Sequence, residues 1–209
     1  MKKVILTGLI VLLVVATKAQ VNFGIKAGPN SYALTGAIEN STIPGGEEMS
    51  YIPATFHLGA FAQINLAKNF AIQPELLFSK EGNAYDVAQN SDPYVRQLTD
   101  LTYISIPVML QYVANSGFNF EAGPALGFLS SAKFKAGSAA ASDLKSYFKG
   151  SNLSFGAGLG YRLKMGLGFH FRYYFGVSNV STEATQPRKT IGGQISVSYK
   201  FGGSTASKK

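Results

Sequence analysis

Hydrophobic and polar residues alternate along eight separate segments of this chain. Within each segment, side chains two positions apart share a character, so that one face is apolar and the other mixes glycine with polar and charged groups. A period of two is that of a β-strand. The segments cover residues 21–28, 56–66, 70–79, 103–112, 118–128, 153–163, 167–177 and 190–201.

The segment LGFHFRYYFGV, residues 167–177, shows the pattern most clearly. Phe169, Phe171 and Phe175 fall on one face, and His170 and Arg172 fall on the other. A full positive charge at the centre of so apolar a strand requires that its face meet a polar environment. An arginine facing lipid at mid-membrane costs about 2 to 4 kcal/mol. Inside the barrel, pairing with an acid offsets part of the cost of removing the arginine from water.

The connections between the segments alternate in length. Residues 67–69, 113–117 and 164–166 are tight turns, whereas residues 31–54, 82–100, 135–151 and 178–188 are long and polar. Strands of about ten residues cross a bilayer when tilted by about 45°, and short turns at one rim with long loops at the other are typical of outer-membrane barrels. The pattern therefore predicts an all-β fold, an eight-stranded antiparallel up-and-down transmembrane β-barrel.

The faces of the strands favour lipid outside and polar groups inside. Glycine crowds the polar face, and glycine weakens a strand unless close approach requires it, as in a narrow barrel filled by side chains. Turn positions predict that large interior groups lie opposite glycines: Arg172 opposite Gly158, His170 opposite Gly160, Tyr174 opposite Gly156, and Tyr103 opposite Gly127, with Met109 opposite Glu121. A soluble lipocalin-like barrel with an apolar ligand inside remains an alternative.

Two sets of residues follow from this arrangement. An aromatic girdle at the short-turn end is predicted to contain Phe23, Phe70, Tyr112, Phe118, Tyr161, Phe169, Tyr199 and Phe201, as aromatic rings favour the bilayer interface. A polar network with a structural role in the lumen is predicted to contain Lys26, His57, Glu75, Glu121, Arg162, His170 and Arg172.

The ends of the chain differ from the alternating region. Residues 1–19 resemble a secretory signal peptide, with two early lysines, an apolar core and small residues before Gln20. Removal of these residues takes away Lys2, Lys3 and Lys18, and the formal net charge falls from +8 to +5. Residues 20–201 are then the barrel and residues 202–209 a polar tail. The absence of cysteine excludes disulfides and thiolate chemistry.

Five strand motifs, in order, resemble the PorT-like outer-membrane β-barrel family. They are FGIKAGPN, IQPELLFSKEG, YISIPVMLQY, FEAGPALGFLSS and LSFGAGLGYRL. The resemblance covers essentially the whole mature chain. The resemblance implies an eight-stranded barrel without an assigned biochemical activity, and the family name points to protein secretion across the outer membrane.

Candidate chemistry is sparse. His57 and His170 are the only histidines, and Ser79, Ser196 and Ser198 are the serines that a hydrolase triad could use, but no motif selects them. No catalytic, cofactor-binding or metal site is predicted. Four lysines near the long loops form a loose basic set: Lys133, Lys135, Lys145 and Lys149. They belong either to a solvated rim, which is the simpler interpretation, or to a contact with lipopolysaccharide phosphates as point charges.

We therefore expect an integral protein of the bacterial outer membrane, with no enzymatic activity and no cofactor. Its role is expected to be structural or interaction-based, through loops 31–54 and 82–100. Expected partners are outer-membrane lipid and lipopolysaccharide, the barrel insertion machinery and a protein at these loops, but no nucleic acid. The alternatives are a narrow channel for small solutes, a membrane-embedded lipid hydrolase and the soluble ligand binder.

Overall fold

The computed structural model describes residues 21–35, 48–51, 54–89, 92–183 and 187–202. The predicted signal segment 1–19 and all but the first residue of the predicted tail lie outside these ranges. Residues 36–47, in the predicted loop 31–54, lie outside them as well. Among the described residues no helix has the length and apolar character needed to cross a membrane.

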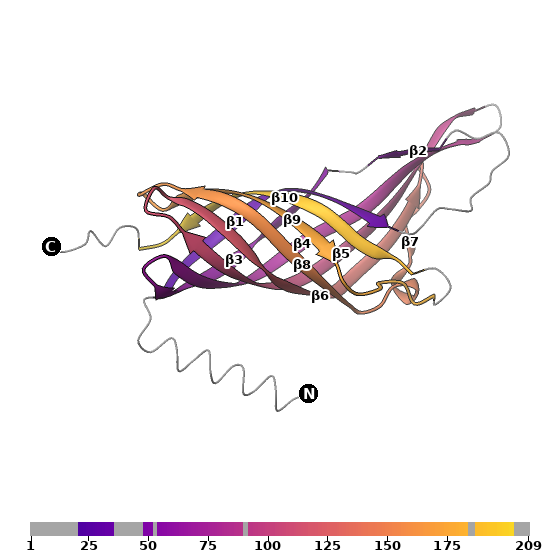
Figure 1. The fold of residues 1–209 in the computed structure, drawn as a ribbon. Coiled ribbons are helices and arrows are strands. Elements are labelled where there is room, and N and C mark those ends of the chain that lie inside the picture. The colour runs from indigo at the N-terminus through magenta and orange to yellow at the C-terminus, as the bar shows by residue number, and fades with distance from the viewer. Residues whose placement is uncertain (1–20, 36–47, 52–53, 90–91, 184–186, 203–209) are drawn as a thin grey trace.

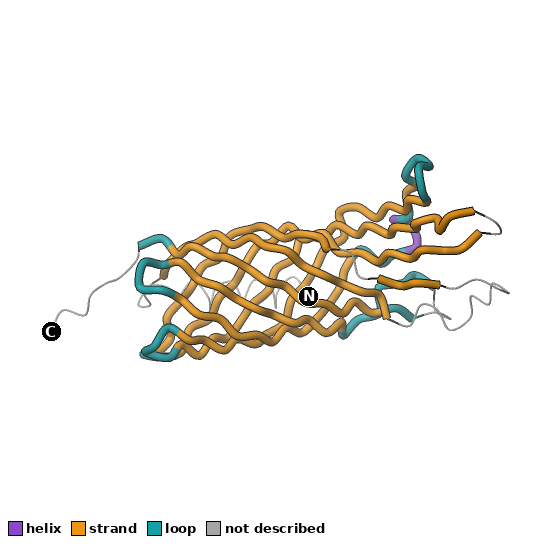
Figure 2. The backbone as a smooth tube through the Cα atoms, turned by 90° about the horizontal axis from the view of Figure 1, so that it is seen from above, coloured by secondary structure: helices purple, strands orange, loops and turns teal. Residues whose placement is uncertain are grey.

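Eight antiparallel strands close into a barrel (Figures 1 and 2). Around the ring, each strand pairs with its neighbour, and the ring closes where β4 pairs with β5. The strands of the ring are β1 (Val21–Thr35), β3 (Ala54–Ala67), β4 (Phe70–Gln89), β5 (Asp92–Val113), β6 (Phe118–Ala136), β8 (Ser151–Arg162), β9 (Leu167–Gly176) and β10 (Lys189–Lys200). The eight-stranded antiparallel fold predicted from the alternation is confirmed.

Three short elements lie outside the ring. Strand β2 (Glu48–Tyr51) pairs with β4, and β7 (Ser142–Asp143) pairs with β6. A single 3₁₀ turn, η1 (Lys145–Tyr147), follows β7. All three lie at the end of the barrel with the long connections, to the right in Figure 1.

The predicted loop 82–100 is wrong as a loop, because most of it is a β-hairpin. Strands β4 and β5 stay paired from the barrel out to Gln89 and Asp92, well beyond the neighbouring strands (Figure 1). The backbone ladder continues because β-favouring residues such as Tyr85, Val87 and Val95 alternate with polar ones, which suits a solvated two-stranded ribbon. Likewise β1 runs to Thr35 and β6 to Ala136, inside the loops predicted from residues 31 and 135.

The strand faces divide as the alternation predicts. Along β6, exposed and buried side chains alternate from Phe118 to Ser130. Outward-facing apolar side chains such as Phe120, Leu126 and Ile195 are exposed, whereas the inward-facing side chains are buried. An exterior this apolar and an interior this polar match a barrel whose outer surface meets lipid.

Glycines opposite large side chains make the narrow interior possible. Between β8 and β9 the register pairs Gly158 with Arg172 and Gly156 with Tyr174, as predicted. A Cβ atom on Gly156 would lie 2.6 Å from the Tyr174 ring. Gly160 and His170 also pair.

Between β5 and β6 the predicted register is wrong by two residues. Tyr103 pairs with Leu129, and Glu121 pairs with Gln111 instead of Met109. The reason lies in the turn: Gly117 adopts a left-handed φ of 97° and belongs to the turn, so that the hairpin closes at Ala114 and Phe118. The Tyr103 ring nevertheless packs over Gly127, 3.2 Å from where a Cβ would stand.

Candidate functional site

The centre of the lumen holds a compact cluster of two cations and two anions. Arg172 of β9 is bidentate to Glu75 of β4, with Nη2–Oε1 and Nη1–Oε2 distances of 2.8 and 3.0 Å. Its Nε donates to Oε1 of Glu121, on β6, at 2.8 Å. Lys26 of β1 lies 3.4 Å from both carboxylate oxygens of Glu75. The cluster thus ties together strands from opposite sides of the barrel.

Buried amides and a phenol complete the surroundings of these charges. Arg172 also donates to the Tyr174 hydroxyl at 2.8 Å, Gln73 donates to Glu75, and Gln111 donates to Glu121. None of the four charged residues is more than 3% exposed. Their formal charges cancel, and charge-assisted bonds of this kind offset the cost of removing ions from water.

Both histidines face the lumen and pair with serines on β10. His57 Nε2 lies 2.8 Å from Ser196 Oγ, and its Nδ1 lies 3.4 Å from Asn30 Oδ1. His170 Nε2 lies 3.0 Å from Ser198 Oγ, with Nδ1 3.8 Å from Glu121.

The second histidine thus has the order of a serine–histidine–acid triad, but all of these side chains are buried. A nucleophile has to reach its substrate, and here it is packed inside the wall. Among the described residues, no three histidine or acidic side chains are placed to hold a metal ion.

Arg162 lies apart from the other predicted lumen residues. The sequence suggests that it shares the interior acids, but its Nη1 donates instead to Oε1 of Gln63 on β3, at 2.8 Å. It sits at the end of the barrel with the short turns, because it is the last residue of β8. The other six predicted residues, Lys26, His57, Glu75, Glu121, His170 and Arg172, are buried in the lumen proper.

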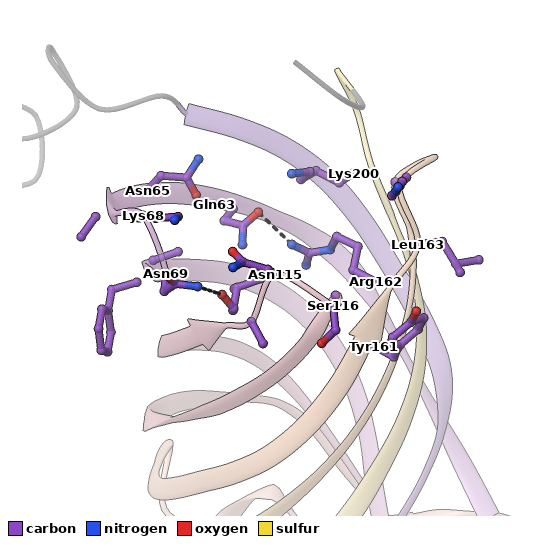
Figure 3. Close-up of a pocket in the computed structure, with 18 of the residues that line it drawn as sticks. Gln63, Asn65, Lys68, Asn69, Asn115, Ser116, Tyr161, Arg162, Leu163 and Lys200 are labelled. Carbon is purple, nitrogen blue, oxygen red and sulfur yellow. Dashed lines mark hydrogen bonds between the residues drawn. The ribbon is translucent and has the colours of Figure 1, made fainter. Parts of the chain in front are cut away.

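A cavity of about 960 Å³ opens at this end, and we call it the turn-side mouth. Its described lining contains Arg162, Lys200, Lys68 and Lys164, together with amides such as Gln63 and no acidic residue. Figure 3 shows Gln63, Asn115, Arg162 and Lys200 gathered at this mouth. This mouth was not predicted, because its residues come from turns and strand ends distant in sequence.

At the opposite end, an apolar cluster closes the lumen. Phe148 and Val180 come from two different connections, which meet through a bridge between Phe148 and Ser181 and a bond from Lys149 N to Val180 O of 2.8 Å. The buried members of this outer plug are Leu101, Tyr103, Leu129, Ala132, Phe148 and Val180. The alternation does not predict this plug, because residues 135–151 and 178–188 have the pattern of long polar loops.

Glu81 lies between the plug and the charge cluster, beside a cavity of only about 20 Å³. On the outside of the barrel, Lys80 lies beside Glu81, and Asp100 and Thr102 lie beside its partner Leu101. All three are polar, so Glu81 lies beyond the membrane-spanning segments. Burial raises the pKa of its carboxyl group from 4.5 to about 8, against the smaller opposing effect of a hydrogen bond with Ser79. Its Oε2 has no hydrogen-bond partner. The raised pKa favours the protonated, neutral form of Glu81 at pH 7.

The eight predicted girdle residues all face outward. Phe70 and Tyr112 meet edge to face with ring centroids 5.3 Å apart, and Phe118 and Tyr161 do so at 5.6 Å. The girdle consists of Phe23, Phe70, Tyr112, Phe118, Tyr161, Phe169, Tyr199 and Phe201, all exposed at the short-turn end. Such a ring of aromatic side chains suits the bilayer interface.

Residues 16–182 match the family model described as outer membrane protein beta-barrel domain. The chain belongs to this family. It is accordingly an outer-membrane β-barrel protein of bacteria. Short turns in such barrels face the periplasm and long loops face the outside, so the turn-side mouth opens to the periplasm.

Several solved structures resemble this outer-membrane barrel. Ail, the attachment invasion locus protein of Yersinia pestis, solved in complex with the heparin analogue sucrose octasulfate, is 15% identical with a TM-score of 0.49, over 87% of this chain and 99% of that one. Neisserial surface protein A is 12% identical with a TM-score of 0.46, over 87% and 99%. OprG from Pseudomonas aeruginosa is 13% identical with a TM-score of 0.42, over 88% and 97%. No curated protein matches the chain.

Proposed function

We propose that this protein is a closed outer-membrane scaffold that binds a partner through its extracellular rim and has no catalytic activity. The observation that carries the proposal is the division of the molecule into a blocked interior and a projecting hairpin. The lumen is filled at its centre by Arg172 with Glu75 and Glu121, and closed at the outer end by the plug. This leaves little room for solute passage or for access to a buried nucleophile.

The projecting element is the outer part of the β4–β5 hairpin. Backbone pairing continues without a break from Gly82 and Asp100 to Tyr85 and Gln97, and reaches Val87. Strand β2 pairs with the same region and widens it into a small sheet. A sheet above the membrane offers a surface for a partner, and an edge strand can offer backbone groups for pairing with it.

The proposal includes membership of the PorT-like family and a contact with lipopolysaccharide. The five strand motifs favour membership of the PorT-like family, and a role in secretion would then place the partner in a secretion assembly. Lys133 and Lys135 are exposed on β6 near the outer rim, where lipopolysaccharide phosphates lie, and lysines bind phosphate as point charges.

Site-specific photo-crosslinking in intact cells tests the rim as a binding surface. A photoreactive residue at Gln97 in the hairpin is expected to give one covalent adduct of defined mass, identified by mass spectrometry. The same residue at Lys68, in a short turn, is the control and should not give that adduct. Identical adducts from both positions would contradict the proposal. So would the absence of an adduct from Gln97 and from every other position tested in the hairpin.

A shortened variant locates the contact. Tyr85 and Gln97 pair directly, so an Asn-Gly turn can replace residues 86–96 and leave every described pairing between β5 and β6 in place. The variant should keep the heat-dependent gel mobility of a folded barrel. With the photoreactive residue kept at Gln97, it should lose the adduct.

A further inference from the structure

The turn-side mouth differs from the rest of the interior in the balance of its charges. In the centre of the lumen each cation has an acid beside it, whereas the described residues around this mouth supply four cations and no acid. Two of the cations, Arg162 and Lys200, are half-buried at the base of the mouth, and the other two, Lys68 and Lys164, stand on exposed turns. Concentrated positive charge in a concave site attracts anions.

Arg162 has one edge without a partner. Its Nη1 is used by Gln63, but Nε and Nη2 are buried without a hydrogen-bond partner. These two nitrogens point their hydrogens to the same side of the planar guanidinium group, which is the side that binds carboxylate or phosphate in a bidentate manner. Buried donors left without partners cost free energy, and an oxyanion would satisfy both.

A chain of amides holds Arg162 in this orientation. Gln63 accepts from Arg162 and donates to Gln111 at 2.9 Å, and Gln111 donates to Glu121 at 2.8 Å. Because Glu121 already accepts from Arg172, its charge is engaged at the centre of the lumen. The positive charge of Arg162 thus stays oriented but not neutralised by direct contact with a carboxylate.

We propose that the turn-side mouth binds a phosphate-bearing anion from the periplasmic side. A phosphate group offers more acceptor oxygens than a carboxylate, which suits a site with an arginine fork, three lysines and several side-chain amides. The same chemistry is found on the headgroup of a phospholipid in the inner leaflet and on a soluble phosphate compound. This binding is independent of the partner proposed for the outer rim.

Calorimetric titration with inorganic pyrophosphate tests the site. The mature chain is folded into nanodiscs of phosphatidylcholine, and pyrophosphate should bind saturably, with affinity that falls as salt increases. The variant Arg162→Gln with Lys200→Gln should bind at least about tenfold more weakly, because it removes the fork and the adjacent charge.

The matched control changes the same net charge at the opposite end of the barrel. Lys80→Gln with Lys189→Gln should leave pyrophosphate affinity within about twofold, since charges far from a site are screened. Equal weakening in both variants, or no saturable binding by the unaltered chain, would overturn the proposal.

A third variant covers the case in which loss of Arg162 prevents folding. Lys68→Gln with Lys164→Gln alters only exposed turn residues, and heat-dependent gel mobility checks the fold. This variant should bind pyrophosphate about threefold more weakly, as expected for exposed point charges. Unchanged affinity in this variant would count against the site.

Lipid retention separates the two sources of phosphate. In discs that contain phosphatidylglycerol, native mass spectrometry counts the anionic lipids that stay with the barrel. Fewer retained lipids in the Arg162→Gln, Lys200→Gln variant would identify a lipid headgroup as the ligand. Equal retention together with site-dependent pyrophosphate binding would identify a soluble phosphate compound, and the absence of both effects would overturn the site.

Discussion

Arg172 is the residue on which the polar interior depends. It is the member of the central cluster that contacts both Glu75 and Glu121, and its own strand also supplies Tyr174. Removing one member of a buried ionic cluster leaves the remaining charges without compensation, whereas removing the whole cluster does not. The two kinds of substitution should therefore have opposite consequences for stability.

Arg172→Met is expected to destabilise the barrel by about 3 to 5 kcal/mol, because two buried carboxylates then face a single lysine. Urea unfolding in detergent micelles, followed by circular dichroism and gel mobility, measures the change. A variant in which Lys26→Met, Glu75→Gln and Glu121→Gln accompany Arg172→Met should regain most of the loss. If this neutral variant is as unstable as Arg172→Met alone, the cluster acts by packing and not by charge.

Glu81 makes stability depend on pH near neutrality. Its pKa is raised from 4.5 to about 8 in the folded protein by burial, so the folded state holds a proton that the unfolded state releases. The stabilising contribution is complete below about pH 4.5 and is lost as pH rises towards about 8, by at most about 1.4 kcal/mol per pH unit. The urea midpoint should accordingly fall between about pH 7 and about pH 9, above the range in which histidines of the unfolded chain titrate.

Glu81→Gln should remove this fall, because an amide stays neutral at all of these pH values. At alkaline pH the variant should be the more stable protein. Asp100→Asn, on the outer face of the same hairpin, is the control and should keep the pH dependence of the unaltered chain. A midpoint that falls equally in the Glu81→Gln variant would refute the assignment.

At the level of the strands, several large interior side chains depend on a glycine in the neighbouring strand. The hairpin of β8 and β9 alternates in this way, with Gly156, Gly158 and Gly160 beneath Tyr174, Arg172 and His170. Alternation and turn length predicted this register because the turn from Leu163 to Leu167 closes as the sequence suggests. They failed between β5 and β6, where the turn lies one residue further along the chain and closes at Ala114 and Phe118. The pattern of apolar positions does not place a turn to within a single residue.

Gly156→Ala should destabilise the barrel by about 1 to 3 kcal/mol, the usual cost of overpacking. The new methyl group would lie 2.6 Å from the Tyr174 ring, which is held between the wall and Arg172. Gly193→Ala on β10 is the matched control, since its nearest atoms lie at 3.7 Å or beyond. Urea midpoints should fall for the first variant and not for the second, and equal shifts would contradict the packing argument.

At the level of the whole molecule, the sequence predicts the membrane-spanning wall of the barrel more fully than the two ends of its lumen. Strand faces, girdle and central charges follow from alternation, which is local. The outer plug and the turn-side mouth bring together residues such as Phe148 with Val180 and Gln63 with Arg162, whose meeting depends on the closed ring. Contacts between connections leave no periodic signal in the sequence. Residues 82–100, 135–151 and 178–188 were therefore predicted as long polar loops.

The two closures together predict that the protein does not conduct ions. The charge cluster fills the centre of a lumen that is narrow for its own side chains, and the plug of Phe148 and Val180 covers the outer end. Planar bilayer recordings of the folded protein should show no discrete conductance steps. The neutral variant, with Lys26→Met, Glu75→Gln, Glu121→Gln and Arg172→Met, should also be silent, since its side chains still fill the lumen. Steady steps in the unaltered chain, seen only with protein that shows the heat-dependent gel shift, would mean that a solute path opens past the plug and that the rim is not the main functional surface.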